Sequence, residues 1–132
     1  MGIRETENAY IEDFKQLEDA ESQCEYLLQL GMRQRIPEEE LRRDAYRIEG
    51  CHTAIWLKTE LRGDRVYFQG DSDSLLVKGI LLILKEMYDG RAAGEAAKYP
   101  PRFLAYIADA VIYREIKTNG IFKCYQKLAA YH

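Results

Sequence analysis

The apolar positions of the chain follow two different periods, one typical of helices and one typical of strands. Residues 7–17 and 19–30 carry apolar side chains at the three- and four-residue spacing of half-buried helices, the second with Asp19 as a capping residue. Gly31 is expected to end this second helix, because glycine favours helix C-termini. A short acidic turn is then predicted over residues 38–41.

Strict alternation between apolar and polar positions begins further along the chain. Residues 54–62 alternate as a half-buried strand does, and after a Gly-Asp turn signal residues 65–69 are predicted to return as its partner. Residues 45–48 are predicted to form a further short strand. Trp56 falls on the polar face, so we expect that face to be covered near the start of the strand. These segments predict a small antiparallel meander.

A continuous apolar stretch over residues 75–87 predicts a buried central helix that lies across the sheet. The preceding residues 71–74 are rich in helix-capping types, and capping of this helix accounts for the two aspartates among them. A glycine inside a helix costs about 1 kcal/mol relative to alanine. Gly79 therefore predicts close approach of another backbone, and Gly90 is expected to end the helix.

Weaker helical signals occupy the C-terminal third. They predict a short helical turn over 92–97, a helix with apolar positions from 103 to 111, and a loop and cap over 117–120. A final amphipathic helix follows, with its inner face at residues 121–128. The order of helices, meander and helices predicts one α+β, two-layer domain over residues 1–132.

Composition and charge restrict the class of protein. The 132 residues are 47% hydrophobic and 31% charged, which is typical of a soluble globular protein. The net charge of −3 argues against nucleic-acid binding. No apolar run approaches the roughly 18 residues that span a bilayer. Three widely spaced cysteines without an apolar N-terminal signal segment favour a reducing, cytoplasmic location.

The candidate chemistry centres on Cys51, which directly follows Gly50 in a loop between two predicted strands. Glycine permits a sharp turn, and a loop thiol can meet another molecule. A lone cysteine without a partner motif is usually a small buried apolar residue, and this alternative stays open. Cys24 and Cys124 lie on apolar helix faces, where core packing explains them.

Three kinds of thiol site remain open. Cys51 and His52 could bind a metal or cluster together with a carboxylate from Asp71 or Asp73, although no C-x-x-C or H-x-x-x-H pattern is present. A cysteine hydrolase or reductase would need a histidine base, for which an adjacent His52 is badly placed. The third site is a sulfur carrier, in which Cys51 holds a persulfide under apolar cover from Trp56 and its neighbours.

Several motifs together resemble the SufE-like family of sulfur-acceptor proteins. Residues 48–57, Ile-Glu-Gly-Cys-His-Thr-Ala-Ile-Trp-Leu, are similar to the family's V-x-G-C-Q-S-x-V-W segment. Residues 71–79 resemble its D-S-D-x-x-x-V-x-G helix start, and Asn119-Gly120 falls where the family has R-x-N-G or R-x-Q-G. The cysteine segment combined with the aspartate-rich helix start is more specific than either motif alone.

The resemblance implies a function and a partner. Cys51 would accept sulfane sulfur from a pyridoxal-phosphate cysteine desulfurase, stimulate that enzyme, and pass the sulfur to a scaffold for iron–sulfur cluster assembly or to another acceptor. The chain would be an accessory protein rather than an enzyme, with no cofactor of its own and an α+β fold shared with iron–sulfur scaffold proteins.

The resemblance also implies supporting residues around the cysteine. Gly50, His52, Trp56, Asp71, Asp73 and Lys117 are the candidates for supporting the loop or docking the partner. His52 replaces the family's glutamine, and either Lys117 or Arg114 takes the place of its arginine. Lysine keeps the charge of arginine but lacks its two-pronged geometry.

Overall fold

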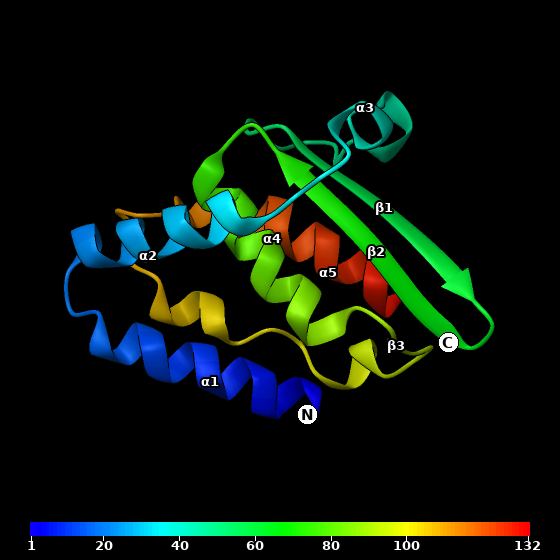
Figure 1. Cartoon of the computed structure of the whole chain (residues 1–132), viewed down its shortest axis with the longest axis horizontal. Coiled ribbons are helices and arrows are strands. Elements are labelled where there is room, and N and C mark those ends of the chain that lie inside the picture. Colours follow the sequence, from blue (N-terminus) through cyan, green and yellow to red (C-terminus); the bar gives the residue numbers. More distant parts are fainter.

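The computed structural model describes residues 1–132 and contains five α-helices and a three-stranded antiparallel sheet (Figure 1). The elements are α1 (Ile3–Gln16), α2 (Ala20–Arg33), α3 (Glu38–Leu41), β1 (Ile55–Arg62), β2 (Arg65–Ser72), α4 (Leu75–Tyr88), β3 (Arg91–Ala92) and α5 (Phe122–Ala129). Helix α4 packs against β2 and α5 against β1, so helices and sheet form two layers. This confirms the predicted α+β class.

The sheet is built on the predicted hairpin. β1 and β2 pair in full register from Ile55 opposite Ser72 to Arg62 opposite Arg65. The predicted strand over residues 45–48 was wrong: the chain forms a 3₁₀ turn over 44–46 and a single bridge from Arg47 to Trp56. Asp44 favours a turn there, and too few residues remain before the cysteine loop to extend the ladder. The third strand, β3, comes instead from the chain after α4.

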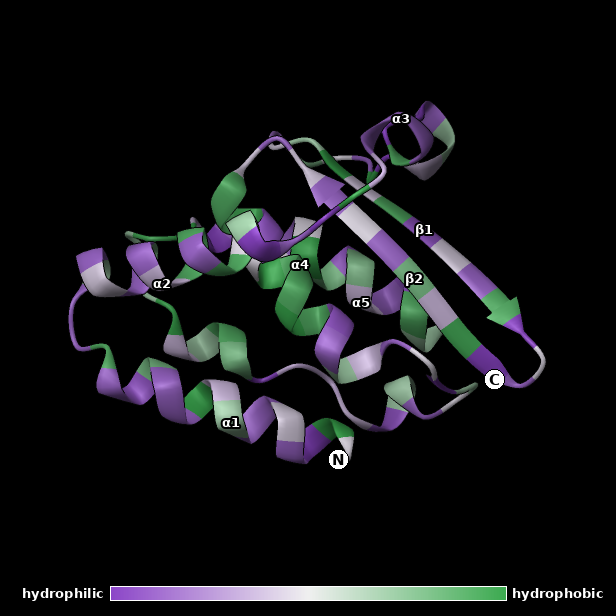
Figure 2. Cartoon of the chain, viewed as in Figure 1, coloured by the Kyte–Doolittle hydropathy of each residue, from purple (hydrophilic) through white to green (hydrophobic).

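Helix α4 is the centre of the core, as predicted. Its side chains at 77, 80, 83, 84 and 87 are fully buried, and Figure 2 shows its apolar character beside the mixed surfaces of α1 and α2. A Cβ atom on Gly79 would lie 2.3 Å from the carbonyl oxygen of Leu27 in α2. The expected close backbone approach is therefore confirmed.

Gly31 serves the same contact rather than a helix end. Helix α2 continues to Arg33, so the predicted stop at Gly31 was wrong. A Cβ atom on Gly31 would lie 2.2 Å from the carbonyl oxygen of Leu75 at the start of α4. The two glycines lie where α2 and α4 touch, and each leaves room for the other helix's backbone.

The helix caps agree only in part with the sequence. Asp19 accepts a hydrogen bond from the Ser22 amide at 2.7 Å and caps α2 as predicted, which lowers the pKa of its carboxyl. Helix α4, however, is capped by Ser74, whose Oγ accepts from the Val77 amide at 3.3 Å. Capping therefore does not account for the two aspartates. Asp71 belongs to β2, and the Asp73 carboxylate pairs with Arg42.

The C-terminal third departs most from prediction. The helix expected from residue 103 is only a 3₁₀ turn, Phe103–Tyr106. Buried side chains from α1 and α2 hold this segment: Glu7 accepts from the Phe103 amide at 3.0 Å, and Gln23 accepts from the Ala108 amide at 2.9 Å. The loop predicted over 117–120 is also wrong, because Ile116–Ile121 forms a π-helical turn continuous with α5. The predicted inner face of α5 is buried, as expected.

The edge of β2 that faces away from β1 is covered by charged side chains. At Phe68, Asp89 accepts from the amide at 2.8 Å and Lys85 donates to the carbonyl at 2.7 Å. At Ser72, Asp71 accepts from the amide at 2.7 Å and Arg42 donates to the carbonyl at 3.3 Å. No helix combines the length and apolar character needed to cross a bilayer.

Candidate functional site

Cys51 lies in a short loop that leaves and rejoins the sheet at its β1 end. The Arg47–Trp56 bridge and a hydrogen bond from the Ile48 amide to the Ile55 carbonyl, at 2.8 Å, close the base of this loop. Gly50 has a φ of 78°, a left-handed conformation that side chains disfavour. The glycine thus turns the backbone directly before the cysteine.

The Cys51 thiol lies in an apolar niche rather than pointing into solvent. Its side chain is half-buried and packs against the hydrophobic core. The facing surface is Gly120 in the π-helical turn: a Cβ atom there would lie 2.8 Å from Cys51 Sγ and 3.0 Å from Ile55 Cδ1. Glycine at position 120 therefore leaves the space that the thiol fills.

Side chains hold the backbone of the loop at both ends. Asn119 Nδ2 donates to the Gly50 carbonyl at 2.9 Å, and Lys123 Nζ donates to the Glu49 carbonyl at 2.6 Å. At the other end, Ser72 Oγ donates to the Ala54 carbonyl at 2.7 Å. The loop is thus fixed to the start of α5 on one side and to the end of β2 on the other.

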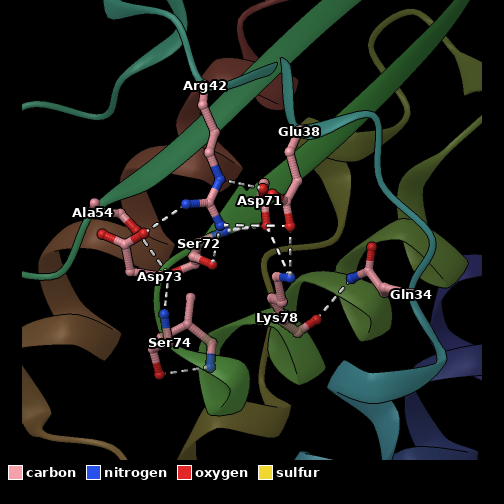
Figure 3. A network of polar contacts seen from close by, with 10 residues as sticks. Gln34, Glu38, Arg42, Ala54, Asp71, Ser72, Asp73, Ser74 and Lys78 are labelled. Carbon is pink, nitrogen blue, oxygen red and sulfur yellow. Dashed lines mark hydrogen bonds and ion pairs between the residues drawn. The ribbon is translucent and has the colours of Figure 1, made fainter. Parts of the chain in front are cut away.

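A polar network supports the β2 end of the loop (Figure 3). Asp71 is fully buried and accepts from Arg42 Nε at 2.8 Å, with Lys78 Nζ 3.5 Å away. Arg42 also donates to Asp73 at 2.8 Å, and its guanidinium lies 4.8 Å from the centre of the Trp56 ring. The hydrogen bond to Asp71 raises the pKa of Arg42 above its usual value.

This network accounts for three of the sequence-predicted candidates. Trp56 is buried beneath Arg42, so the expectation that the polar face of β1 is covered at this end is confirmed. Asp71 and Asp73 are joined through Arg42, which the sequence analysis did not single out. The buried carboxylate of Asp71 needs a charged partner, and the same arginine also holds the exposed carboxylate of Asp73 just after β2.

The other candidates lie further from the thiol's niche. The His52 side chain is 92% exposed, with Nε2 3.5 Å from the Glu115 carboxylate. Lys117 Nζ donates to the Ile107 carbonyl and to Asp109 at 2.9 Å, which lowers the pKa of the Asp109 carboxyl. Lys117 thus ties the π-helical turn to the segment at 107–109 rather than to the cysteine loop.

The sequence analysis placed Asn119-Gly120 in a family motif but did not link these residues, or Lys123, to the cysteine loop. The spacing of Asn119 and Lys123 by four residues was the available signal, since it places two side chains on one helix face. That signal was lost because residues 117–120 were predicted to be a loop rather than a helical turn.

The other two cysteines differ in exposure: Cys24 in α2 is half-buried, as Cys51 is, whereas Cys124 in α5 is fully buried. All three are free. Burial and, to a smaller extent, the nearby Cys51 raise the pKa of the Cys124 thiol to about 12. Cys124 therefore remains a protonated, weakly nucleophilic thiol at neutral pH.

The structure does not assemble the ligands that a metal site would need. It contains no group of three or more His, Cys, Asp or Glu side chains arranged to hold a metal ion. His52 is directed to Glu115, and Asp71 and Asp73 are engaged by Arg42. The metal or cluster alternative of the sequence analysis therefore has no ligand set here.

The structure defines a small α+β protein with a half-buried free cysteine in a loop. Residues 8–131 match the model of the family described as SufE, Fe-S metabolism associated domain. The chain therefore belongs to the SufE family.

Curated relatives agree with this assignment. The chain is 37% identical over 93 residues to an uncharacterized SufE-like protein of Rhizobium etli, covering 66% of this chain and 62% of the relative. It is 26% identical over 118 residues to an uncharacterized SufE-like protein of Synechocystis, covering 89% and 74%. It is 30% identical over 89 residues to the sulfur acceptor protein CsdE of Escherichia coli, covering 67% and 60%. The match thus spans less than two thirds of the Rhizobium relative and of CsdE.

Proposed function

We propose that this chain is a sulfur acceptor, which takes sulfane sulfur as a persulfide on Cys51 from a cysteine desulfurase. The observation that carries the proposal is the placement of Cys51: a loop thiol turned into an apolar niche by Gly50 and Gly120. Membership of the SufE family and similarity to a protein named as a sulfur acceptor support it.

The transfer is a thiol exchange without net oxidation. The Cys51 thiolate attacks the outer sulfur of a persulfide on the desulfurase. A new S–S bond forms on Cys51, and the bond between the enzyme's cysteine and that sulfur breaks. The enzyme's thiolate leaves and takes up a proton. The desulfurase is then ready for another turnover, so the acceptor stimulates it.

The niche has a consequence for each half of the transfer. Cys51 Sγ lies against Gly120 and the side chain is half-buried, so an outward turn of the side chain would present the thiol to a partner's persulfide. Once loaded, a return of the side chain toward the niche would cover the outer sulfur with apolar groups. This cover would slow loss of the persulfide to small reductants, which need access to it.

The proposal includes the fate of the sulfur and the setting. We take residues 1–132 as one sulfur-acceptor domain, active in the cytoplasm, where thiols stay reduced. The sulfur passes from Cys51 to a scaffold for iron–sulfur cluster assembly or to another acceptor. Pyridoxal phosphate belongs to the desulfurase, and no step of the transfer needs a cofactor on this chain. Gly50, His52, Trp56, Asp71, Asp73 and Lys117 remain candidates for supporting the loop or docking the partner.

Intact-protein mass measurement tests the proposal. The chain is incubated with a cysteine desulfurase and free cysteine, and wild type is compared with Cys51→Ser and with a Cys24→Ser control. We expect wild type and the control to gain the mass of one sulfur atom, reversibly on reduction, and Cys51→Ser to gain none. Failure of the wild type to gain sulfur, or equal loading of Cys51→Ser, would falsify the proposal.

A further inference from the structure

A groove of about 410 Å³ runs along the flank of α5, directly beside the cysteine loop. One wall is the chain segment from Arg47 to Glu49, which leads into the loop. The other wall is a face of α5 that carries Lys123, Gln126 and Lys127. These residues recur three and four positions apart, so they lie on one side of the helix. We call this surface the basic groove.

The basic groove is positively charged on a protein that is negative overall. Three of its lining residues are cations and only Glu49 is an acid, whereas the whole chain has a net charge of −3. None of the three cations forms a salt bridge within the chain. Arg47 and Lys127 are exposed, so their charges face solvent.

The groove is continuous with the thiol site. Lys123 Nζ donates to the Glu49 carbonyl at 2.6 Å, and a Cβ atom on Gly50 would lie 2.7 Å from that nitrogen. Only Gly50 separates Glu49 from Cys51 along the chain. A protein that brings a sulfur atom to Cys51 can therefore also contact the end of the basic groove.

We propose that the basic groove docks an acidic segment of the sulfur-donating protein. This inference rests on the proposed function of Cys51 and names the surface that the donor recognises. Unpaired cations in a concave site attract carboxylates, and such complementarity mainly raises the association rate and fixes the orientation of two partners. The groove would thus bring the donor's persulfide to the loop in one orientation.

Lys127 is the residue best suited to test the groove. It is exposed, lies one helical turn beyond Lys123, and makes no hydrogen bond or ion pair in the structure. Lys127→Glu reverses one groove charge, and Lys127→Arg keeps it. Lys15→Glu in α1 is the matched control, since Lys15 is exposed and its only ion pair is with Glu12, at 3.4 Å.

The measurement is the concentration of each variant that half-maximally stimulates a cysteine desulfurase, at low and high salt. At low salt we expect Lys127→Glu to need about tenfold more protein than wild type, which corresponds to about 1.4 kcal/mol of lost attraction plus new repulsion. Lys127→Arg and Lys15→Glu should match wild type. High salt should reduce the difference in half-maximal concentration between Lys127→Glu and wild type. Near 1 M salt the Debye length is only a few ångströms, so charges on the two proteins are screened from each other.

The outcomes separate this inference from the proposed function. At saturating concentration Lys127→Glu should still load one sulfur on Cys51, because the thiol and its niche are intact. If wild type loads sulfur but Lys127→Glu and Lys15→Glu are equally potent at low salt, the docking inference is wrong while the acceptor role stands. If Lys127→Glu instead loses only binding to anionic vesicles or nucleic acid, the groove recognises a different partner and the inference is likewise overturned.

Discussion

At the scale of single residues, Gly120 determines where the Cys51 thiol lies. The glycine lacks the Cβ atom that would come within 2.8 Å of Cys51 Sγ. It occupies a π-helical turn, a conformation that is rare in proteins and often found at functional sites. A helix without this glycine would have no space for the thiol, and the cysteine would have to turn toward solvent.

Gly120→Ala should therefore expel the Cys51 side chain from its niche. If overpacking by the new methyl group costs about 1.4 kcal/mol, the equilibrium between the buried and the exposed position of the Cys51 side chain shifts about tenfold toward the exposed one. We expect Cys51 to react correspondingly faster with a thiol-specific disulfide reagent. The rate of this reaction at neutral pH is the measurement, with Thr118→Ala, an exposed neighbour, as the control. An unchanged rate in Gly120→Ala would show that the niche does not limit access to the thiol.

The sequence located the cysteine but not its surroundings. Gly50-Cys51 stands out as a glycine followed by a loop thiol between extended segments. Gly120 lies 69 positions after Cys51, and no local pattern links the two. Arg42 was not singled out, since nothing in its sequence neighbourhood reveals a buried partner at Asp71. Long-range contacts of this kind depend on the fold and not on periodicity.

At the scale of elements, helices α2 and α4 pack closely against each other, and the sequence predicted this close approach. Gly79 was predicted to allow the approach of another backbone, and the Leu27 carbonyl is that backbone. Helix propensity alone favours alanine at this position by about 1 kcal/mol. A Cβ atom 2.3 Å from a carbonyl oxygen, however, requires the two helices to separate.

Gly79→Ala should consequently destabilise the fold despite the gain in propensity. We expect a net loss of about 2 to 3 kcal/mol in the free energy of unfolding, because overpacking against backbone cannot be relieved by a side-chain rotation. Urea denaturation measures this loss. Gly70→Ala is the control, since its nearest neighbours are side-chain methyl groups of Leu57 and Leu81 at 3.4 Å. Equal stability of Gly79→Ala and wild type would contradict the argument.

Elements with strong periodicity were predicted, and those held by tertiary contacts were not. The β1–β2 hairpin and α4 follow their sequence periods closely. The segment after Pro101 has helical spacing, yet Glu7 and Gln23 bond to its amides and it forms only a 3₁₀ turn. Gly31 was misread as a stop for the same reason, since its role is set by a partner helix 44 positions away at Leu75.

At the scale of the whole molecule, Arg42 joins the segment after α3 to the end of β2 and to the cysteine loop. Its guanidinium holds Asp71 and Asp73, and Ser72 between them holds the Ala54 carbonyl. Removing one partner of a buried ion pair leaves a charge without compensation, which is costly. Lys78 near Asp71 would offset part of that cost.

Arg42→Ala should therefore lower the free energy of unfolding by about 2 to 4 kcal/mol and loosen the loop. Arg42→Lys should have an intermediate effect, because lysine keeps the charge but cannot bind two carboxylates as a fork. Urea denaturation gives the stability, and hydrogen exchange of the amides at 50–54 reports on the loop. Arg43→Ala, which removes an exposed and unpaired arginine, is the control. If hydrogen exchange at residues 50–54 is the same in Arg42→Ala and Arg43→Ala, the Arg42 network does not stabilise the cysteine loop.

The charged side chains along the free edge of β2 also affect how copies of the protein meet in a concentrated solution. Exposed strand edges are templates on which identical chains can stack into insoluble aggregates. Here the outward amide and carbonyl groups at Phe68 and Ser72 are already occupied by Asp89, Lys85, Asp71 and Arg42. The backbone groups at these two positions are therefore not free to hydrogen-bond to a strand of a second copy.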